Sequence, residues 1–247
     1  MTRLPGCEEL TSITLAELEQ SAALHTRTDR KYIVELDLLA ELVAEHSDQF
    51  AVLTIGDRRE FDYESVYFDT PDHALHRAAA AGRRRRFKVR TRLYDPTTAV
   101  LEVKTKDGRG RTVKHRLEYS PEDHGQLTDE GLGFIDEQTG QPELTPQLTP
   151  SLVTRYWRAT LVDAVAGTRV TVDQQLECVT PDGSLITLGQ VIVETKSDVA
   201  AGPIDRWLWR HGARPEPISK YCTSLAALTP GLPANKWHRT LARHFRA

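Results

Sequence analysis

The feature that most constrains the fold of this chain is a regular alternation of apolar and charged residues near its middle. Successive side chains of a β-strand point to opposite faces, so such alternation places the charges on one face and the apolar groups on the other. Three segments in succession follow this pattern: 87–94, 99–106 and 112–119. Asp95-Pro96 and Asp107-Gly108 supply turns between them. The sequence therefore predicts three consecutive antiparallel strands, each with one charged face.

The charges on that face are mostly positive. From Arg83 to Arg116 there are thirteen Lys and Arg against three Asp and Glu, a net charge of +10, so the rest of a chain of net charge −3 carries −13. A solvated sheet face usually mixes small polar residues with Glu and Lys, and like charges opposite one another destabilise a sheet. The planar guanidinium of Arg matches phosphate oxygens. The pattern therefore favours an anionic partner: a nucleic acid, a membrane surface or a phosphorylated small molecule.

The remaining segments predict five more strands and several helices. One domain, with helices covering a mostly antiparallel sheet, is the expected arrangement. Asp37 and Pro71 are expected to begin two of the helices. The further strands are expected at 28–35, 65–69, 152–162, 169–173 and 189–196, for a total of about eight, and the helices at 14–24, 37–43, 71–81, 205–210 and 219–228.

Several classes of protein are disfavoured. No run of about eighteen apolar residues exists, so no membrane-spanning helix is expected. Glu8 and Glu9 occupy the place where a signal peptide needs apolar residues, which predicts a cytoplasmic protein. The three cysteines lack metal-ligand spacing and are expected to be buried, reduced thiols. The basic strands lack the interleaved aromatic residues on which nucleic-acid bases stack, so a nucleic-acid partner is disfavoured.

The charged face has two interpretations. An open antiparallel sheet would expose it to water. A closed sheet of about eight strands would point it inward, into a bore that holds side chains or one slender ligand. Each buried, unpaired charge costs several kcal/mol, so such an interior must contain water, carboxylates or a polyanion. Two strand segments also place a Glu two residues before a Lys on one face, at Glu102/Lys104 and Glu194/Lys196.

Nine short motifs, none specific alone, follow one another along the chain. They are Arg30-Lys31-Tyr32, Val66–Thr70, Arg90-x-Arg92-x-Tyr94, Leu101–Lys106, Arg116, Arg155–Arg158, Arg169–Asp173, Val191–Lys196 and Ser219-Lys220-Tyr221. In this order, over about residues 26–228, they resemble the VTC domain. This is the polyphosphate-polymerase domain of the vacuolar transporter chaperone, within the CYTH-like superfamily of triphosphate tunnel metalloenzymes.

The resemblance implies an α+β fold: an eight-stranded antiparallel β-barrel, the triphosphate tunnel, with surrounding helices. One domain would span 1–247, with its core at about 26–228. The implied activity is metal-dependent transfer of the γ-phosphoryl group of ATP to a polyphosphate chain. The residues implied to be catalytic by gripping phosphate are Lys31, Arg90, Arg92, Lys104, Arg116, Arg158, Arg169, Lys196 and Lys220. Glu102 and Ser219 join them in substrate binding, and Glu194, with Glu102 as a second acid, is implied to hold Mn²⁺ or Mg²⁺.

Departures from the family pattern leave alternatives open. The Glu-x-Glu-x-Lys signature of the wider superfamily is absent, which favours the VTC branch over the adenylate-cyclase and thiamine-triphosphatase branch. Pro217 stands where the polymerase has a second Lys, which leaves a tunnel triphosphatase acting on tripolyphosphate or a nucleoside triphosphate as one alternative. A non-catalytic polyphosphate-binding module is another. The chain shows no SPX sensor domain, so inositol-phosphate sensing or transport would need other chains, including a membrane partner.

Overall fold

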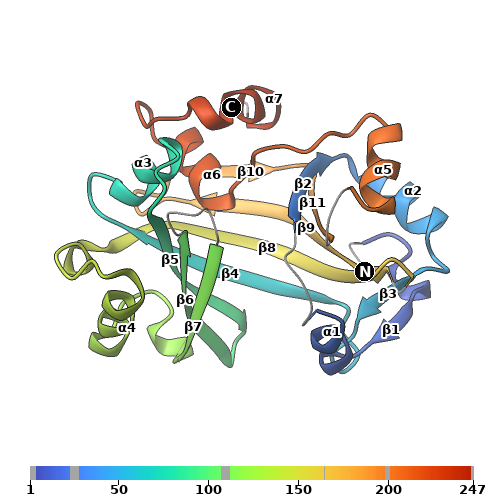
Figure 1. Ribbon diagram of the computed structural model, residues 1–247, viewed down its shortest axis with the longest axis horizontal. Helices are drawn as coiled ribbons and strands as arrows, with labels where there is room; N and C mark the ends of the chain where they lie inside the picture. Colours follow the sequence, from blue (N-terminus) through green and yellow to red (C-terminus); the bar gives the residue numbers. More distant parts are fainter. Residues whose placement is uncertain (1–3, 23–27, 107–111, 164, 198–200, 246–247) are drawn as a thin grey trace. The chain divides into compact units, whose positions relative to one another are not determined.

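The structure is a computed structural model that describes residues 4–22, 28–106, 112–163, 165–197 and 201–245 (Figure 1). Its strands are β1 Thr11–Ile13, β2 Thr28–Val34, β3 Phe50–Leu53, β4 Glu60–Asp69, β5 Arg86–Asp95, β6 Thr98–Lys106, β7 Thr112–Tyr119, β8 Thr149–Asp163, β9 Thr168–Val179, β10 Leu185–Leu188 and β11 Val191–Ser197. Its α-helices are α1 Leu15–Ala22, α2 Leu36–Glu45, α3 Ala74–Ala80, α4 Asp129–Thr139, α5 Pro203–Arg210, α6 Lys220–Leu228 and α7 His238–His244. Four 3₁₀ turns are η1 Cys7–Glu9, η2 Pro121–Asp123, η3 Thr145–Gln147 and η4 Asn235–Trp237.

The strands pair in the order β2-β11-β9-β8-β4-β5-β6-β7. These eight correspond to the eight strands expected from the sequence, and an α+β fold with a large antiparallel sheet is confirmed. The three strands that the sequence analysis missed, β1, β3 and β10, are short and lie off this path. A closed barrel is not confirmed, because no pairing in the described part of the chain joins β2 to β7 and the sheet is left with two ends.

The chain divides into two compact units, each with its own core. Unit 1 comprises Met1–Asp62, Tyr156–Leu176 and Leu188–Pro217. Its core packs side chains of β2, β9 and β11 against α2 and α5, with Trp207 nearly fully buried. Pro203 opens α5, and Asp205 accepts a hydrogen bond from the backbone N–H of Gly202 at 2.8 Å. The buried Asp205 also accepts hydrogen bonds from Tyr32 and Thr195, which fixes α5 to two strands.

Unit 2 comprises Tyr63–Arg155, Glu177–Thr187 and Ile218–Ala247 and contains the three alternating strands. The apolar faces of β6 and β7 pack against α4, where Leu101 and Val103 meet Ile135 in one buried cluster (Figure 1). Thr128 caps α4, and its side chain accepts a hydrogen bond from Gly131. A Cβ at Gly131 would lie 2.9 Å from the hydroxyl of Tyr119, so a larger residue there would force the Tyr119 side chain to shift. The charged side chains therefore occupy the other face of these strands.

Two helix starts differ from expectation. Helix α3 begins at Ala74 rather than at Pro71, because the buried carboxylate of Asp69 accepts hydrogen bonds from the backbone N–H groups of Leu75 and His76 and so caps the helix from a distance. Helix α2 begins at Leu36, which places Asp37 in its first turn, where the helix dipole still favours an acid.

Two other expectations concern the cysteines and the membrane. Cys7, Cys178 and Cys222 are buried free thiols, as expected. No helix in the described ranges is long and apolar enough to cross a membrane.

Candidate functional site

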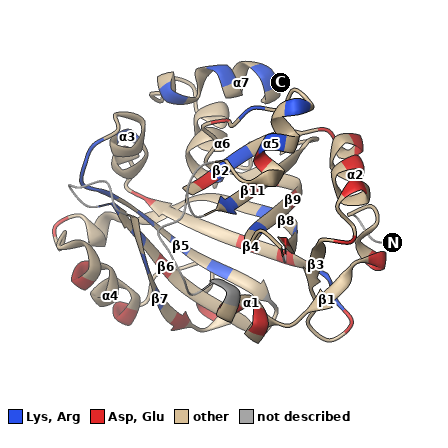
Figure 2. Ribbon diagram, turned by 45° about the vertical axis from the view of Figure 1, so that its right-hand side comes forward, with Lys and Arg blue, Asp and Glu red and all other residues tan. Residues whose placement is uncertain are grey.

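Strands β5, β6 and β7 contain Lys and Arg residues (Figure 2), and the strand register places them in neighbouring rows on one face. The register sets Arg86 opposite Lys106 in one row. The next row aligns Lys88, Lys104 and Lys114, one from each strand. Like charges facing one another across strands repel. A multivalent anion lying on these rows would replace that repulsion with attraction, so the register itself indicates an anion-binding face.

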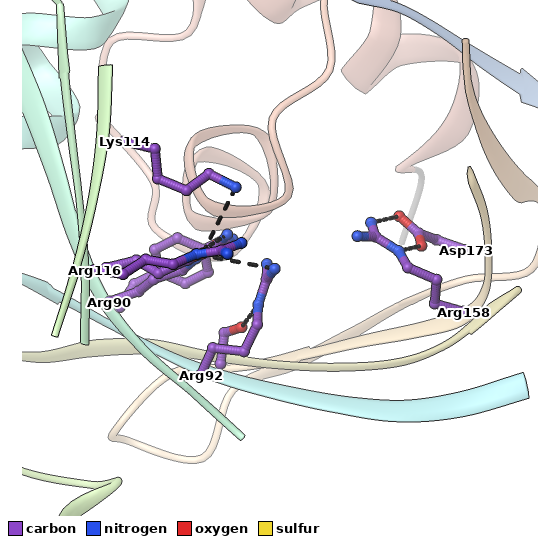
Figure 3. A network of polar contacts seen from close by, with 9 residues as sticks. Arg90, Arg92, Lys114, Arg116, Arg158 and Asp173 are labelled. Carbon is purple, nitrogen blue, oxygen red and sulfur yellow. Dashed lines mark hydrogen bonds and ion pairs between the residues drawn. The ribbon is translucent and has the colours of Figure 1, made fainter. Parts of the chain in front are cut away.

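The following row has a carboxylate at its centre. Glu102 on β6 lies between Arg90 on β5 and Arg116 on β7, and its side chain is only 2% exposed. Arg90 donates to Glu102 Oε2 through both Nε, at 2.6 Å, and Nη2. Arg116 Nε donates to Oε1 at 3.0 Å, and Lys114 Nζ lies 3.6 Å from the same oxygen. Arg92 Nη1 approaches Oε2 at 3.9 Å, so four cations converge on one acid (Figure 3).

This cluster holds an excess of positive charge. Burial alone raises the pKa of Glu102, but the charges of Arg90, Arg92 and Lys114 outweigh it and hold that pKa well below its usual range. Burial and repulsion from the arginines outweigh the attraction of Glu102 and lower the pKa of Lys114 to about 8. The low pKa of Glu102 reports strongly positive surroundings, and repulsion from the arginines adds to the burial that lowers the pKa of Lys114. A phosphate chain fits this potential.

Tyr67 on β4 contacts Arg90. Its hydroxyl accepts a hydrogen bond from Arg90 Nη1 at 2.9 Å, and its ring stacks on Tyr221 with centroids 4.8 Å apart. Although burial raises the pKa of Tyr67, the positive charges of Arg90, Arg92 and Lys88 lower it on balance. Arg92 is itself 5% exposed, and its Nε lies 3.3 Å from Ser65 Oγ. These contacts fix the two guanidinium groups, so little ordering remains for a ligand to impose.

The N-terminus of α6 adds donors to the same unit. Ser219 caps this helix by accepting a hydrogen bond from the backbone N–H of Cys222 at 3.3 Å. The same hydroxyl accepts from Lys88 Nζ at 2.7 Å, which links α6 to β5. Lys220 is the first residue of the helix. The helix dipole adds partial positive charge at this end, so Ser219 and Lys220 stand where an anion is favoured.

Unit 1 contains a smaller set of the expected residues. Glu194 on β11 lies opposite Lys31 on β2. Lys31 Nζ is 2.9 Å from Glu194 Oε2 and Lys196 Nζ is 3.1 Å from Oε1, while the Glu194 side chain is 12% exposed. Burial alone raises the pKa of Glu194, but Lys31, Lys196 and Arg158 outweigh it and hold the pKa well below its usual range. Glu194 is therefore an anion at every physiological pH.

Arg158 and Arg169, also in unit 1, have protein partners. Arg158 makes a two-pronged ion pair with the fully buried Asp173, at 2.5 Å from Nε to Oδ1 and 2.7 Å from Nη2 to Oδ2 (Figure 3). Arg169 lies opposite Lys196 in the sheet and donates a hydrogen bond to the carbonyl oxygen of Leu18 at 3.2 Å. These contacts orient both guanidinium groups. Asp173 fixes Arg158 most firmly, since both of its oxygens are used.

Sequence reasoning missed three residues of these clusters: Lys88, Lys114 and Asp173. Lys88 and Lys114 alternate in phase with Arg90 and Arg116, so the period of two already placed them on the charged face. The family resemblance alone would not have selected them.

The structure gathers Arg90, Arg92, Glu102 and Arg116 in unit 2, and Lys31, Glu194 and Lys196 in unit 1. Lys104 lies in the row between Lys88 and Lys114.

The two acids differ in their fitness for a metal ion. Neither belongs to a group of three potential ligand residues in the described part of the chain. Mg²⁺ is commonly held by one or two carboxylates together with substrate phosphates and water, so a single carboxylate can suffice. At Glu194 a metal would compete with two lysines, which phosphate oxygens could draw away. At Glu102 it would compete with four cations, of which Arg90 and Arg116 hydrogen-bond the carboxylate, and arginine holds a carboxylate more firmly than lysine does.

The lowered pKa of Lys114 predicts a pH dependence. Below its pKa of about 8 the lysine is charged, and a bound anion stabilises that form, so binding draws in a proton near neutrality. We expect the affinity for tripolyphosphate to fall about tenfold more from pH 7 to pH 9 in the native protein than in Lys114→Met. Calorimetry with both proteins measures this, since ionisation of the ligand itself affects both equally. Equal slopes would contradict the assignment of Lys114 to the anion site.

Comparison with known proteins gives one family and two similar structures. A family model described as the VTC domain matches residues 26–229. The solved structure of the inorganic triphosphatase NE1496 is 11% identical and has a TM-score of 0.31, covering 72% of this chain and 77% of that one. Another, described as the hypothetical protein NE1496, is 12% identical with a TM-score of 0.30, covering 71% and 78%. No curated protein matches the chain.

Proposed function

Because the chain belongs to the VTC domain family, we propose that it is a metal-dependent phosphotransferase that moves the γ-phosphoryl group of ATP to a polyphosphate chain. The observation that carries the proposal is the convergence of four cations on the single buried carboxylate of Glu102. One acid does not neutralise four bases. The surplus charge is held in place by protein contacts, which suits a ligand whose phosphates supply the missing negative charge.

The length of the basic face supports a repeating anion. Arg86, Lys88, Arg90 and Arg92 follow one another along the same face of β5, and each lies opposite a residue of β6. Alternate residues of a strand are about 6.8 Å apart, so four of them extend over roughly 20 Å. This run is longer than one triphosphate group. A linear polyphosphate could therefore contact successive rows, each through the same chemistry.

Phosphoryl transfer requires no side-chain nucleophile. An oxygen of the terminal phosphate of the acceptor chain attacks the γ-phosphorus of ATP, the bond from that phosphorus to the β,γ-bridging oxygen breaks, and ADP leaves. The protein must align the two phosphates and neutralise their charge, and Arg90, Arg116 and Arg158 would bind the oxygens with their planar groups. A bound Mn²⁺ or Mg²⁺ would supply further charge to the transferred group, and Glu194 would hold it, with Glu102 as the second candidate acid.

We also propose that residues 1–247 form one domain with its core at about 26–228, and that it binds the phosphate chain. In support, the family match at 26–229 includes segments of both units. Lys31, Arg158, Arg169 and Lys196 of unit 1 would then bind phosphate oxygens, as Lys104, Ser219 and Lys220 of unit 2 would. The three free thiols support a reducing compartment such as the cytoplasm.

The direct test is to incubate the purified protein with ATP and Mn²⁺ and to separate the products on a gel. We expect a ladder of polyphosphate chains, with ADP formed in step. Orthophosphate as the only product would contradict the polymerase activity and support the triphosphatase activity. The triphosphatase is the alternative that Pro217 favours, because this residue replaces a lysine of the polymerase pattern. No turnover, combined with a large rise in melting temperature on adding tripolyphosphate, would point to a non-catalytic binding module.

A further inference from the structure

We propose that Glu41, Glu45 and His211 form a divalent metal site that takes Zn²⁺ and is separate from the phosphate-binding residues. The three side chains are exposed, and one potential ligand atom from each lies within 4.8 Å of the others. Glu41 and Glu45 belong to α2, and His211 follows the last residue of α5. All three lie in unit 1. The proposal does not rest on the proposed function.

The positions of the two glutamates are unfavourable without a cation. They are four residues apart on α2, so they share one face of the helix and repel each other. They also stand near its C-terminal end, where the helix dipole disfavours negative charge. No basic residue occupies the last turn of α2 to offset either effect. A bound cation would remove both penalties together.

Trp207 orients two of the three ligands. Its indole N–H donates a hydrogen bond to Glu45 Oε2 at 2.6 Å. Its carbonyl oxygen lies 2.9 Å from His211 Nδ1, and since a carbonyl can only accept, Nδ1 carries the proton. In the neutral imidazole, Nε2 then keeps its lone pair, and it lies 3.7 Å from Glu41 Oε1. Outer contacts of this kind fix the tautomer and the direction of histidine ligands in metal sites.

Stacking on the indole ring of Trp207 restricts the movement of the His211 side chain. The imidazole of His211 stacks on Trp207 with centroids 3.8 Å apart and planes 24° apart, and Trp207 is only 2% exposed. The histidine is therefore held against a fixed surface, which lowers the cost of ordering it on binding.

The ligand set favours Zn²⁺. One imidazole and two carboxylates are three protein ligands, which in zinc sites leave a fourth, tetrahedral position for water. With zinc-to-ligand distances of about 2.1 Å, ligand atoms of such a site are about 3.4 Å apart. The distance of 3.7 Å between His211 Nε2 and Glu41 Oε1 is close to this value. Glu45 offers a carboxylate oxygen within 4.8 Å of the other two ligand atoms.

The test is calorimetric titration of the full chain with Zn²⁺ after treatment with a chelator. We expect one site of micromolar affinity or better and a rise in melting temperature on zinc addition. His211→Ala and Glu41→Gln should each lower the affinity at least tenfold and remove most of that rise. The control His238→Ala removes another histidine, at the start of α7, and should bind Zn²⁺ as the native protein does.

The Glu194→Gln variant separates this site from the proposed phosphotransferase site. We expect it to retain full Zn²⁺ affinity, whatever its effect on turnover. Loss of Zn²⁺ binding in Glu194→Gln, or native affinity in both His211→Ala and Glu41→Gln, would overturn the proposal. Co²⁺ substitution gives a second readout, because a tetrahedral site produces strong visible absorption bands that His211→Ala should abolish.

Discussion

Replacing Glu102 with glutamine should lower the free energy of unfolding by about 3 kcal/mol, because it leaves four converging cations without their shared counter-charge. This loss is at the lower end of the range for removing one partner of a buried ion pair, because the side chains of Lys114 and Arg116 are partly exposed. The pKa of Glu102 is lower in the folded protein than the ordinary glutamate pKa of about 4.3. Its stabilising effect is therefore fully present above that ordinary pKa and is lost as the pH falls through the pKa of the folded protein. Urea unfolding at pH 7 and low salt measures the change.

The ligand response distinguishes an anion site from a purely structural ion-pair cluster. Tripolyphosphate can replace the missing negative charge, so it should raise the melting temperature of Glu102→Gln more than that of the native protein and bind it about tenfold more tightly. Glu118→Gln, a change at an exposed position of β7, is the matched control and should resemble the native protein in both measurements. Equal ligand-induced shifts in all three proteins would contradict an anion-binding role for this face.

Most of the sheet could be predicted because its signal is periodic. Residues 87–119 alternate with a period of two, and the structure pairs them in the order β5, β6, β7 in antiparallel register. Strands β1, β3 and β10 have three or four residues, too few for a period to emerge. The sequence predicts too early a start for helix α3, because the residue that caps it, Asp69, lies five residues before the helix begins. A distant cap of this kind leaves no local signal.

The candidate site was predictable in its residue types but not in its pairing. Alternation placed Arg90, Glu102 and Arg116 on charged strand faces, but the register that aligns them depends on how the strands pair. The two-pronged contact of Arg158 with Asp173 joins residues of different strands, so no local spacing indicates it. The partners of Glu102 also set its pKa, which sequence alone therefore could not give.

Replacing Glu194 with glutamine should reduce turnover about 10²- to 10³-fold, the usual cost of removing one group that stabilises charge in a transition state. Glu194 is the proposed metal ligand, and the amide keeps its size without its charge. Anion binding should survive, and tripolyphosphate should bind equally or more tightly, because Lys31 and Lys196 lose their internal partner. Assays with ATP and Mn²⁺ measure turnover, and the electron paramagnetic resonance signal of free Mn²⁺ measures how much metal is bound.

The pH profile sharpens this prediction. The pKa of Glu194 lies well below its usual range, so the carboxylate is already ionised at pH 5 and its own titration should not appear in the activity profile at or above that pH. The activity of Glu194→Gln should be low across the whole profile, and its Mn²⁺ binding should be weaker than that of the native protein.

Glu19→Gln, on the exposed surface of α1, controls for the loss of one negative charge and should be fully active. Native turnover in Glu194→Gln would refute the metal role, whereas loss of tripolyphosphate binding would show that Glu194 acts by positioning the lysines instead.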